Sequence, residues 1–504
     1  MLETLFESGA SYLFTNIFQE ERMSERIGRR AILAGSAAAA VVAFDPIGRS
    51  WVTTAHASCG GGGGISIPNL DGELTVDPAA IAEAADDFGH IISRTPIAVL
   101  RPASAKDIRK MVKYANDHGL KVAMRGQGHS TQGQAQVQGG VVIDSRTLNV
   151  IHSITNKKAV VDAGVTWSAL VAASIADGRT PPVLTDYLDL SVGGTLSVGG
   201  VGGATNRKGV QLDNVIELDV VTGEGKLVTC SKTKKRDLFE AVLGGLGQYG
   251  IIVKATIKLE AAEESARIYR LIYADVDQYV ADQVTLADDE RFDYLEGQVQ
   301  PNGLGGFQYM IEAAAWFSDP DQPDDDDLLD ALSFDSSTVE DQPYEQWLRR
   351  LEPTIAFLKL IGVWGFPHPW LDLFLPASEA ASFVGTALTT VATDTQDPIL
   401  FYPFKRSKLT RPLFRVPEED VVFLFDILRT APPIPGVPEA LVDLNRSLYD
   451  IAAAVGGTRY PISSIPFDPS DWEQHYGDEW ENVIELKCEY DPNNVLTPGQ
   501  NIFP

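Results

Sequence analysis

A short loop between residues 124 and 130 combines two glycines with a histidine, His129. Gly126 and Gly128 have no Cβ atom, so the backbone can approach a ligand closely and turn its N–H groups toward a pyrophosphate. A histidine in such a loop would lie beside the ligand and not in a hydrophobic core. The loop lacks the spacing of a Rossmann turn or a P-loop. On its own, a loop of this kind more often holds a histidine that has no chemical role.

A second glycine-rich stretch runs from Gly193 to Gly209. It contains the runs Gly193-Gly194 and Gly199-Gly200-Val201-Gly202-Gly203, which provide a further backbone cradle. Two such cradles in one folded unit favour a large, extended cofactor that contains phosphate.

Alternating strand and helix patterns position both loops. The first loop joins two apolar strands, and Ser104 caps a preceding helix that ends near Gly119. After about Ala262 strands mix with helical segments, and the acidic run at 319–327 is typical of a solvated loop, since it lacks EF-hand spacing. The elements expected in the first half are strands at 97–100, 121–124, 141–144, 159–163, 215–221 and 226–230 and helices at 104–119 and 167–176.

The composition limits the class of ligand. The chain has 504 residues, enough for more than one folded unit, and a formal net charge of -28. Such a charge repels phosphate backbones, so we expect no nucleic-acid partner, and a neutral or cationic small molecule is the easier ligand. The three cysteines, Cys59, Cys230 and Cys488, suggest neither a zinc site nor a disulfide framework, and whether any two pair stays open. We expect no metal site.

The N-terminus has the pattern of an export signal. Arg29-Arg30 precede an apolar run at 31–44, and Ala55-His56-Ala57 offers a cleavage point. We therefore predict a twin-arginine signal at 1–57, a glycine-rich tether at 58–75 and a periplasmic or extracellular location. The apolar run is too short for a membrane span, so none is expected in the mature protein. A short N-terminal helix is the alternative, and Met23 is a second candidate start.

The glycine loops resemble those of a known group of flavoproteins. The run Arg125 to Ser130, followed by Gly133-Gln134-Ala135, resembles the flavin-attachment loop of the vanillyl-alcohol oxidase superfamily, whose FAD-binding domain is of the PCMH type. Within this superfamily, the chain more specifically resembles cytokinin dehydrogenases. That resemblance is carried by segments 185–197, 237–250, 294–297, 367–370, 402–404 and 491–503. Segments 302–355 and 459–468 depart from that family.

The resemblance implies an α+β fold with three parts. Residues 76–262 would form a two-subdomain, PCMH-type FAD-binding domain. Residues 263–480 would form a separate α/β substrate domain built on an antiparallel sheet. Residues 481–504 would return to the FAD-binding domain.

The resemblance also implies that FAD is bonded covalently to His129. A neutral imidazole is a competent nucleophile for that bond. No cysteine precedes Ser191-Val192-Gly193-Gly194, so we expect a single attachment. The implied cofactor-binding residues are His129, Arg125, Gly126, Gln127, Gly128, Ser130, Gln134, Asp186, Thr195, Ser197, Gly199, Gly202, Ile252 and Gln500.

Two carboxylates are the implied catalytic residues. Dehydrogenation at a C–N bond requires a hydride acceptor and a group that takes the amine proton. Asp186 lies among apolar neighbours just before the second glycine loop and would take that proton. Glu296 would assist the substrate or Asp186, although it could be an ordinary strand-end charge, with Asp293 as the alternative acid. Trp364 would line the substrate pocket.

The predicted reaction is oxidation of an N6-isoprenoid adenine, a cytokinin. Its imine product would hydrolyse to adenine and an aldehyde, and oxygen or a quinone would accept the electrons. Two alternatives stay open. One is oxidation of a primary isoprenoid or aromatic alcohol, and the other is a secreted flavin-binding protein without turnover.

Overall fold

The computed structural model describes residues 41–45, 50–53 and 65–503. Most of the predicted export signal and the first part of the predicted tether, residues 58–64, therefore lie outside the described residues, and the signal stays a prediction. Three short strands are described between residues 41 and 66. β1 (Val41–Asp45) pairs antiparallel with β2 (Ser50–Thr53) and with β3 (Ile65–Ser66).

A four-stranded sheet carries the His129 loop at the end of β6. Its order is β4-β5-β7-β6, and β5 and β6 run parallel to β7. The predicted helix packs on it as α4, where the Ser104 side chain accepts a hydrogen bond from the Lys106 amide and Gly119 ends the helix with a φ of 61°. The elements are β4 Glu73–Thr75, α3 Pro78–Ala84, β5 Ala98–Arg101, α4 Ala105–His118, β6 Val122–Arg125, β7 Val141–Asp144 and the 3-10 turn η1 Ser145–Thr147.

A five-stranded antiparallel sheet follows, in the order β12-β11-β13-β9-β8. Between β9 and β11 the chain leaves this sheet and forms the second glycine-rich stretch. The elements are β8 Ile151–Ile154, β9 Lys158–Asp162, α5 Trp167–Ile175, β10 Arg179–Thr180, α6 Val192–Val198, α7 Thr205–Lys208, η2 Gln211–Asn214, β11 Val215–Val221, β12 Leu227–Ser231, α8 Arg236–Val242, β13 Ile251–Lys258 and β14 Glu260–Ala261. The expected strands and helices of this half are present, with bounds that shift by one or two residues.

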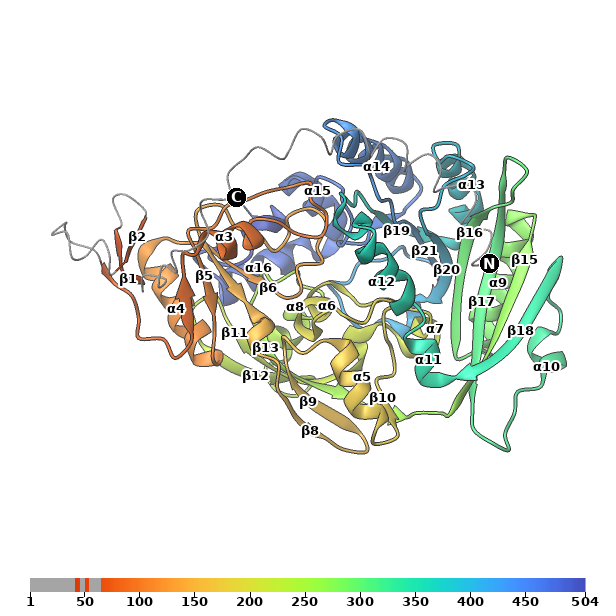
Figure 1. Ribbon diagram of the computed structural model, residues 1–504, viewed down its shortest axis with the longest axis horizontal. Coiled ribbons are helices and arrows are strands. Elements are labelled where there is room, and N and C mark those ends of the chain that lie inside the picture. Colours follow the sequence, from red (N-terminus) through yellow and green to blue (C-terminus); the bar gives the residue numbers. More distant parts are fainter. Residues whose placement is uncertain (1–40, 46–49, 54–64, 504) are drawn as a thin grey trace, which may run out of the picture. The chain divides into compact units, whose positions relative to one another are not determined.

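The second half is built on an eight-stranded antiparallel sheet, drawn green to blue in Figure 1, in the order β18-β15-β17-β16-β20-β21-β19-β22. α9 and α13 cover one face, where Tyr279 bonds the Phe401 carbonyl and Phe383 packs on Phe425. The elements are β15 Ser265–Tyr273, α9 Val276–Asp289, β16 Tyr294–Pro301, β17 Phe307–Phe317, α10 Asp325–Leu329, β18 Ser336–Pro343, β19 Leu371–Pro376, α13 Ala377–Leu388, β20 Ile399–Lys405, η4 Arg406–Lys408, β21 Val421–Ile427 and β22 Thr458–Arg459. The predicted α+β class and the antiparallel sheet are confirmed.

Residues 344–365 form a separate segment that links β18 to β19. It contains α11 (Tyr344–Leu348), α12 (Glu352–Leu360) and the turn η3 (Val363–Gly365). α12 buries none of its residues, although it is rich in apolar side chains. Its position therefore depends on the contacts at its two ends.

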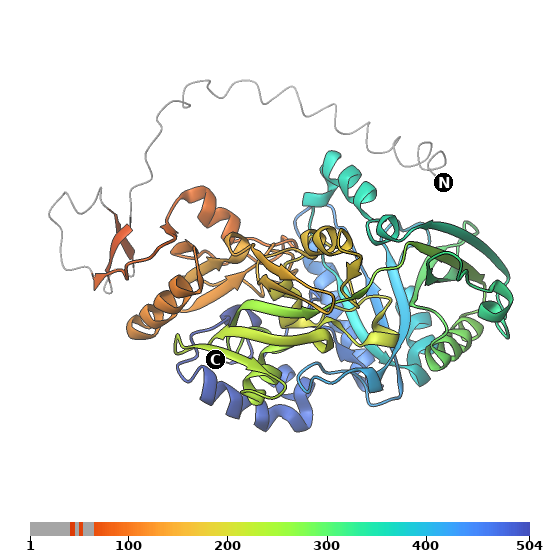
Figure 2. The ribbon, with the colours of Figure 1, turned by 90° about the horizontal axis from the view of Figure 1, so that it is seen from below.

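The C-terminal part returns to the first sheet. The Val122 amide donates to the Val495 carbonyl at 2.8 Å, and the Thr497 amide donates to the Val122 carbonyl at 2.8 Å. Figure 2 shows the blue C-terminal helices beside the lime strands β11 to β13, and the Gly223 amide of the β11–β12 turn bonds the Tyr490 carbonyl at 2.8 Å. The elements are α14 Val437–Ala454, α15 Pro469–Tyr476, η5 Gly477–Glu479, α16 Trp480–Tyr490 and η6 Pro498–Gln500.

The predicted domain boundaries at 75/76, 262/263 and 480/481 stay predictions. β4 lies before residue 76 and already pairs with β5. Within the described residues, Cys230 is buried, Cys488 is exposed and both are free. The same part of the chain holds no group of side chains suited to a metal ion and no helix long and apolar enough to cross a membrane.

Asp491 holds the C-terminal part of the chain that returns to the first sheet, and its loss should destabilise the fold. Its buried carboxylate accepts hydrogen bonds from the Val495 and Leu496 amides, both at 2.9 Å, and pairs with Lys487 at 2.7 Å. We expect Asp491→Ala to lower the free energy of unfolding by about 3–5 kcal/mol, because it leaves a buried cation unpaired. Denaturant unfolding measures this. Glu224→Ala, which breaks an exposed pair with Lys226, should cost only about 0–1 kcal/mol. Equal losses in the two variants would contradict this role.

Candidate functional site

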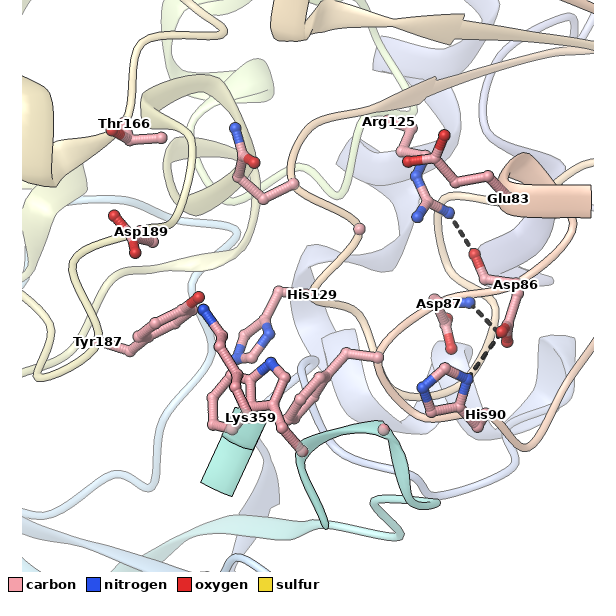
Figure 3. Close-up of a pocket in the computed structure, with 15 residues that line it drawn as sticks. Glu83, Asp86, Asp87, His90, Arg125, His129, Thr166, Tyr187, Asp189 and Lys359 are labelled. Carbon is pink, nitrogen blue, oxygen red and sulfur yellow. Dashed lines mark hydrogen bonds and ion pairs between the residues drawn. The ribbon is translucent and has the colours of Figure 1, made fainter. Parts of the chain in front are cut away.

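His129 lies among aromatic rings on the wall of a cavity of about 510 Å³. Its ring centroid is 4.0 Å from that of Phe88, 4.8 Å from Tyr187 and 6.1 Å from Trp364. Figure 3 shows Tyr187 and Lys359 beside the imidazole, with Asp86, Asp87 and His90 further along the cavity. The cavity is also lined by Gln127, Gly128 and Arg125, as the sequence predicted for cofactor-binding residues.

The loop around His129 presents unused hydrogen-bond donors. Among the described residues, the backbone amides from Gly126 to Ser130 have no protein acceptor. Gly128 has a φ of 73°, and a Cβ there would overlap the Arg125 guanidinium. Arg125 donates to the Asp86 carbonyl, while its buried Nε has no partner. This loop therefore has both the free donors and the space close to the backbone that a phosphate-containing cofactor needs.

The segment 87–89 supports the loop from behind. The Phe88 amide donates to the Gly128 carbonyl at 2.8 Å, and the Gly89 amide donates to the Ser130 carbonyl at 3.1 Å. The buried Asp87 carboxylate accepts from the Gly133 amide at 2.7 Å and from the Ser130 hydroxyl at 3.0 Å. Ser130, predicted to contact the cofactor, thus has a structural bond through its hydroxyl. The loop is held in one conformation by side-chain and backbone bonds together.

Burial shifts the pKa values of His129 and of Asp87 in opposite directions. Burial, followed by the nearby charges of His368 and Lys359, lowers the pKa of His129 to about 3. Its imidazole is therefore neutral at physiological pH and keeps a lone pair for bonding. Burial raises the pKa of Asp87 to about 6, against the hydrogen bonds from Gly133 and Ser130 that lower it.

The chain just before the second glycine-rich stretch packs directly against the first loop. A Cβ at Gly126 would overlap the Ser191 hydroxyl, just before α6. Among the other predicted cofactor contacts here, the Thr195 hydroxyl accepts from Trp167 at 2.8 Å, and the Ser197 hydroxyl donates to the Gly193 carbonyl at 2.8 Å. Both hydroxyls thus have partners within the protein.

The remaining predicted cofactor residues lie around these loops. Gly499 of η6 approaches the carbonyls of Gly133 and Gln134, a few residues after the His129 loop, and the next residue, Gln500, is buried. Gly202 lies against the Leu184 carbonyl, and Gly199 lies against the rings of Phe414 and Tyr460. Ile252 is buried on β13.

The two predicted catalytic carboxylates meet at an arginine, Arg350. Its Nη2 donates to Asp186 Oδ1 at 2.5 Å and lies 3.6 Å from Glu296 Oε2. Tyr294 donates its hydroxyl hydrogen to the same Asp186 Oδ1 at 2.9 Å and accepts a hydrogen bond from Arg350. Asp186 comes from the loop before α6, and Glu296 and Tyr294 come from β16. The predicted pair is thus brought together from two parts of the chain.

Glu296 lies on β16 and is only 1% exposed, so it is not a strand-end surface charge. Its Oε1 is buried and has no hydrogen-bond partner. Burial, followed by the charge of Asp186, raises the pKa of Glu296 well above its usual range and favours its neutral form. The alternative acid, Asp293, pairs with Arg207 instead.

Sequence reasoning missed Arg350, Tyr294 and Asp87. Arg350 lies in the segment that was expected to depart from the resemblance, and a single arginine gives no sequence signal for an ion pair 164 residues away. Tyr294 stands next to the predicted Glu296 on the same face of a strand, and this two-residue spacing could have identified it. Asp87 precedes Phe88-Gly89, and nothing local indicates its long-range bonds. Trp364, predicted to contact substrate, lies at the His129 end of the site.

Comparison with known families identifies both halves of the chain. A family model described as an FAD binding domain matches residues 96–231. A second, described as the FAD and cytokinin binding domain of cytokinin dehydrogenase 1, matches residues 302–503. The first match includes the His129 loop and Asp186, and the second includes Arg350 and η6. The free amides of the loop and the unpartnered Arg125 Nε agree with bound FAD.

Individual relatives extend the match over most of the chain. The uncharacterized oxidoreductase ORF5 in fasciation locus from Rhodococcoides fascians is 39% identical over 85% of this chain and 99% of its own length. Cytokinin dehydrogenase 6 of Oryza sativa is 37% identical over 86% of this chain and 91% of its own length. Cytokinin dehydrogenase 2 of Arabidopsis thaliana is 34% identical over 87% of this chain and 95% of its own length. This chain therefore belongs to the cytokinin dehydrogenase family and is an FAD-dependent oxidoreductase.

Proposed function

We propose that the chain oxidises an N6-isoprenoid adenine at the carbon next to its exocyclic nitrogen. The observation that carries this proposal is the Asp186 carboxylate, which is held at Oδ1 by Arg350 and Tyr294. Its Oδ2 has no protein partner among the described residues and is left to accept a substrate N–H proton. The match to a cytokinin-binding family model over residues 302–503 supports a cytokinin as that substrate.

FAD, when bound, accepts the hydride that leaves the substrate carbon. The chain's own residues hold the substrate and take its proton. Asp186 accepts the proton from the amine nitrogen, so that a C=N bond forms in the substrate as the C–H bond breaks. Water then adds to the imine and releases adenine and an unsaturated aldehyde. Glu296, neutral and buried, is placed to donate a hydrogen bond beside Asp186.

We propose also that His129 carries the FAD through a covalent bond from its imidazole. The neutral ring and its fixed loop support this role, since a protonated imidazole has no lone pair to form the bond. A covalent bond would keep the cofactor in place after the predicted export.

The substrate class is tested by anaerobic bleaching of the bound flavin. We expect isopentenyladenine to bleach the flavin absorbance, because the family model that matches residues 302–503 is a cytokinin-binding one. Isoprenoid and aromatic primary alcohols should bleach it much more slowly. If the alcohols bleach the flavin and isopentenyladenine does not, the chain is an alcohol oxidase and the cytokinin proposal is wrong.

The role of Asp186 is tested by Asp186→Asn. An amide cannot accept the proton, so the rate of anaerobic flavin bleaching by isopentenyladenine should fall about 100-fold or more. Asp177→Asn makes the same change at an exposed turn and should keep the rate. A rate for Asp186→Asn within a factor of two of the unmodified protein would rule out Asp186 as the proton acceptor.

The covalent bond is tested by acid precipitation. The precipitated protein should stay yellow, and His129→Ala should release its flavin to the supernatant, because no other residue is proposed to bind it covalently. His152→Ala, at an exposed histidine on β8, serves as the matched control and should stay yellow. Free flavin in the supernatant of the unmodified protein would refute the bond.

A further inference from the structure

We infer that Arg350 is a positioning residue for the proton acceptor: it fixes the Asp186 carboxylate through Oδ1 so that Oδ2 faces the substrate. The inference rests on the proposed function of Asp186 and adds a residue that the sequence did not indicate. Arg350 lies between α11 and α12, in the 344–365 segment.

The orientation of the Asp186 carboxylate follows from which of its two oxygens accepts the hydrogen bonds. Arg350 Nη2 and the Tyr294 hydroxyl both donate to Oδ1 of Asp186, at 2.5 and 2.9 Å. A carboxylate held twice at one oxygen cannot turn freely, and its second oxygen then points in one direction. A proton acceptor needs this fixed direction, since small displacements of a catalytic group lower the rate strongly.

Arg350 is itself held rigidly. Its guanidinium carbon lies 4.3 Å from the centroid of the Trp347 ring and 5.1 Å from that of Tyr294. The guanidinium thus lies against the edge-to-face pair of Trp347 and Tyr294 while Nη2 reaches Asp186. This is an arrangement that arginine allows and lysine does not. The side chain is 17% exposed, so water screens its charge only in part.

Two further carboxylates lie beside the Arg350 guanidinium. Arg350 Nη2 lies 3.6 Å from Glu296, and Arg350 Nε lies 3.9 Å from Glu312. Before reaction, the Arg350 cation stabilises the ionised Asp186. After Asp186 has accepted the proton, Glu312 still balances the cation, so the charge change leaves no unpaired ion. Glu312 also pairs with Arg270 at 2.8 Å, which fixes it on β17.

The chain offers a matched control one residue away. Arg349 lies in the same link, has a side chain of similar exposure at 22%, and pairs with Glu345 and Glu352. It has no contact with Asp186, Glu296 or Tyr294 among the described residues. Arg349→Met therefore removes the same side chain from the same link without touching the proton acceptor.

The experiment measures the limiting rate and the half-saturating concentration of anaerobic flavin bleaching by isopentenyladenine for Arg350→Met, Arg350→Lys and Arg349→Met. In Arg350→Met we expect the limiting rate to fall about 10- to 100-fold, with a smaller change in the half-saturating concentration. Arg350→Lys keeps the charge and a donor but not the planar fork, so its rate should lie between those of Arg350→Met and the unmodified protein. Arg349→Met should keep the unmodified rate.

The outcomes separate this inference from the function on which it rests. If Asp186→Asn bleaches at the unmodified rate, the proposed proton acceptor is wrong. If Asp186→Asn is slow but Arg350→Met keeps the limiting rate, Arg350 does not position Asp186. A fall in Arg350→Met that Arg350→Lys does not partly restore, or an equal fall in Arg349→Met, would assign Arg350 a merely structural role. Thermal unfolding of each variant confirms that the compared proteins are folded.

Discussion

The site depends on the close approach of backbone segments at three glycines. Gly126 brings the His129 loop against Ser191, and Gly202 brings the second glycine-rich stretch against the Leu184 carbonyl. Gly203 lies against the ring of Tyr294 on β16. A Cβ at any of these positions would overlap its neighbour. Together the three contacts join the cofactor loop, the segment that carries Asp186 and the sheet that carries Glu296, so that parts distant in sequence form one site.

This packing forces ionisable side chains into a small, poorly solvated volume. Burying a charge without a partner costs several kcal/mol, so such a cluster is stable only if its charges compensate each other. Arg350 provides the compensation, since it contacts Asp186 and lies within 4 Å of Glu296 and Glu312. The raised pKa of Glu296 has the same origin, because burial next to Asp186 disfavours a second negative charge. The electrostatics around Asp186 are therefore a consequence of how tightly the glycines allow the chain to pack.

The sequence predicted what local patterns can encode. Glycine spacing indicated the two backbone cradles, and capping residues located α4 from Ser104 to Gly119. The resemblance indicated Asp186 and Glu296, and the structure brings both carboxylates to Arg350 although 110 residues separate them in number. Arg350 could not be found in this way, because an arginine forms ion pairs in many surroundings and its partners were defined only by the fold. Asp87 was missed for the same reason, since its bonds reach Ser130 and Gly133 across more than 40 residues.

The 344–365 segment connects the two ends of the site. Arg350, before α12, holds Asp186, and Trp364, after α12, lies 6.1 Å from the His129 ring and 5.5 Å from Tyr187. Between them α12 buries no residue, so the ion pairs at one end and the ring contacts at the other determine where it lies. Under the proposed reaction, a substrate that changes the charge on Asp186 would alter the first set of contacts, and a cofactor bound beside His129 would alter the second. The position of α12 is thus linked by contact to both ends of the site. The segment lies within the part that the cytokinin dehydrogenase family model matches, so the expected departure of residues 302–355 from that family is wrong.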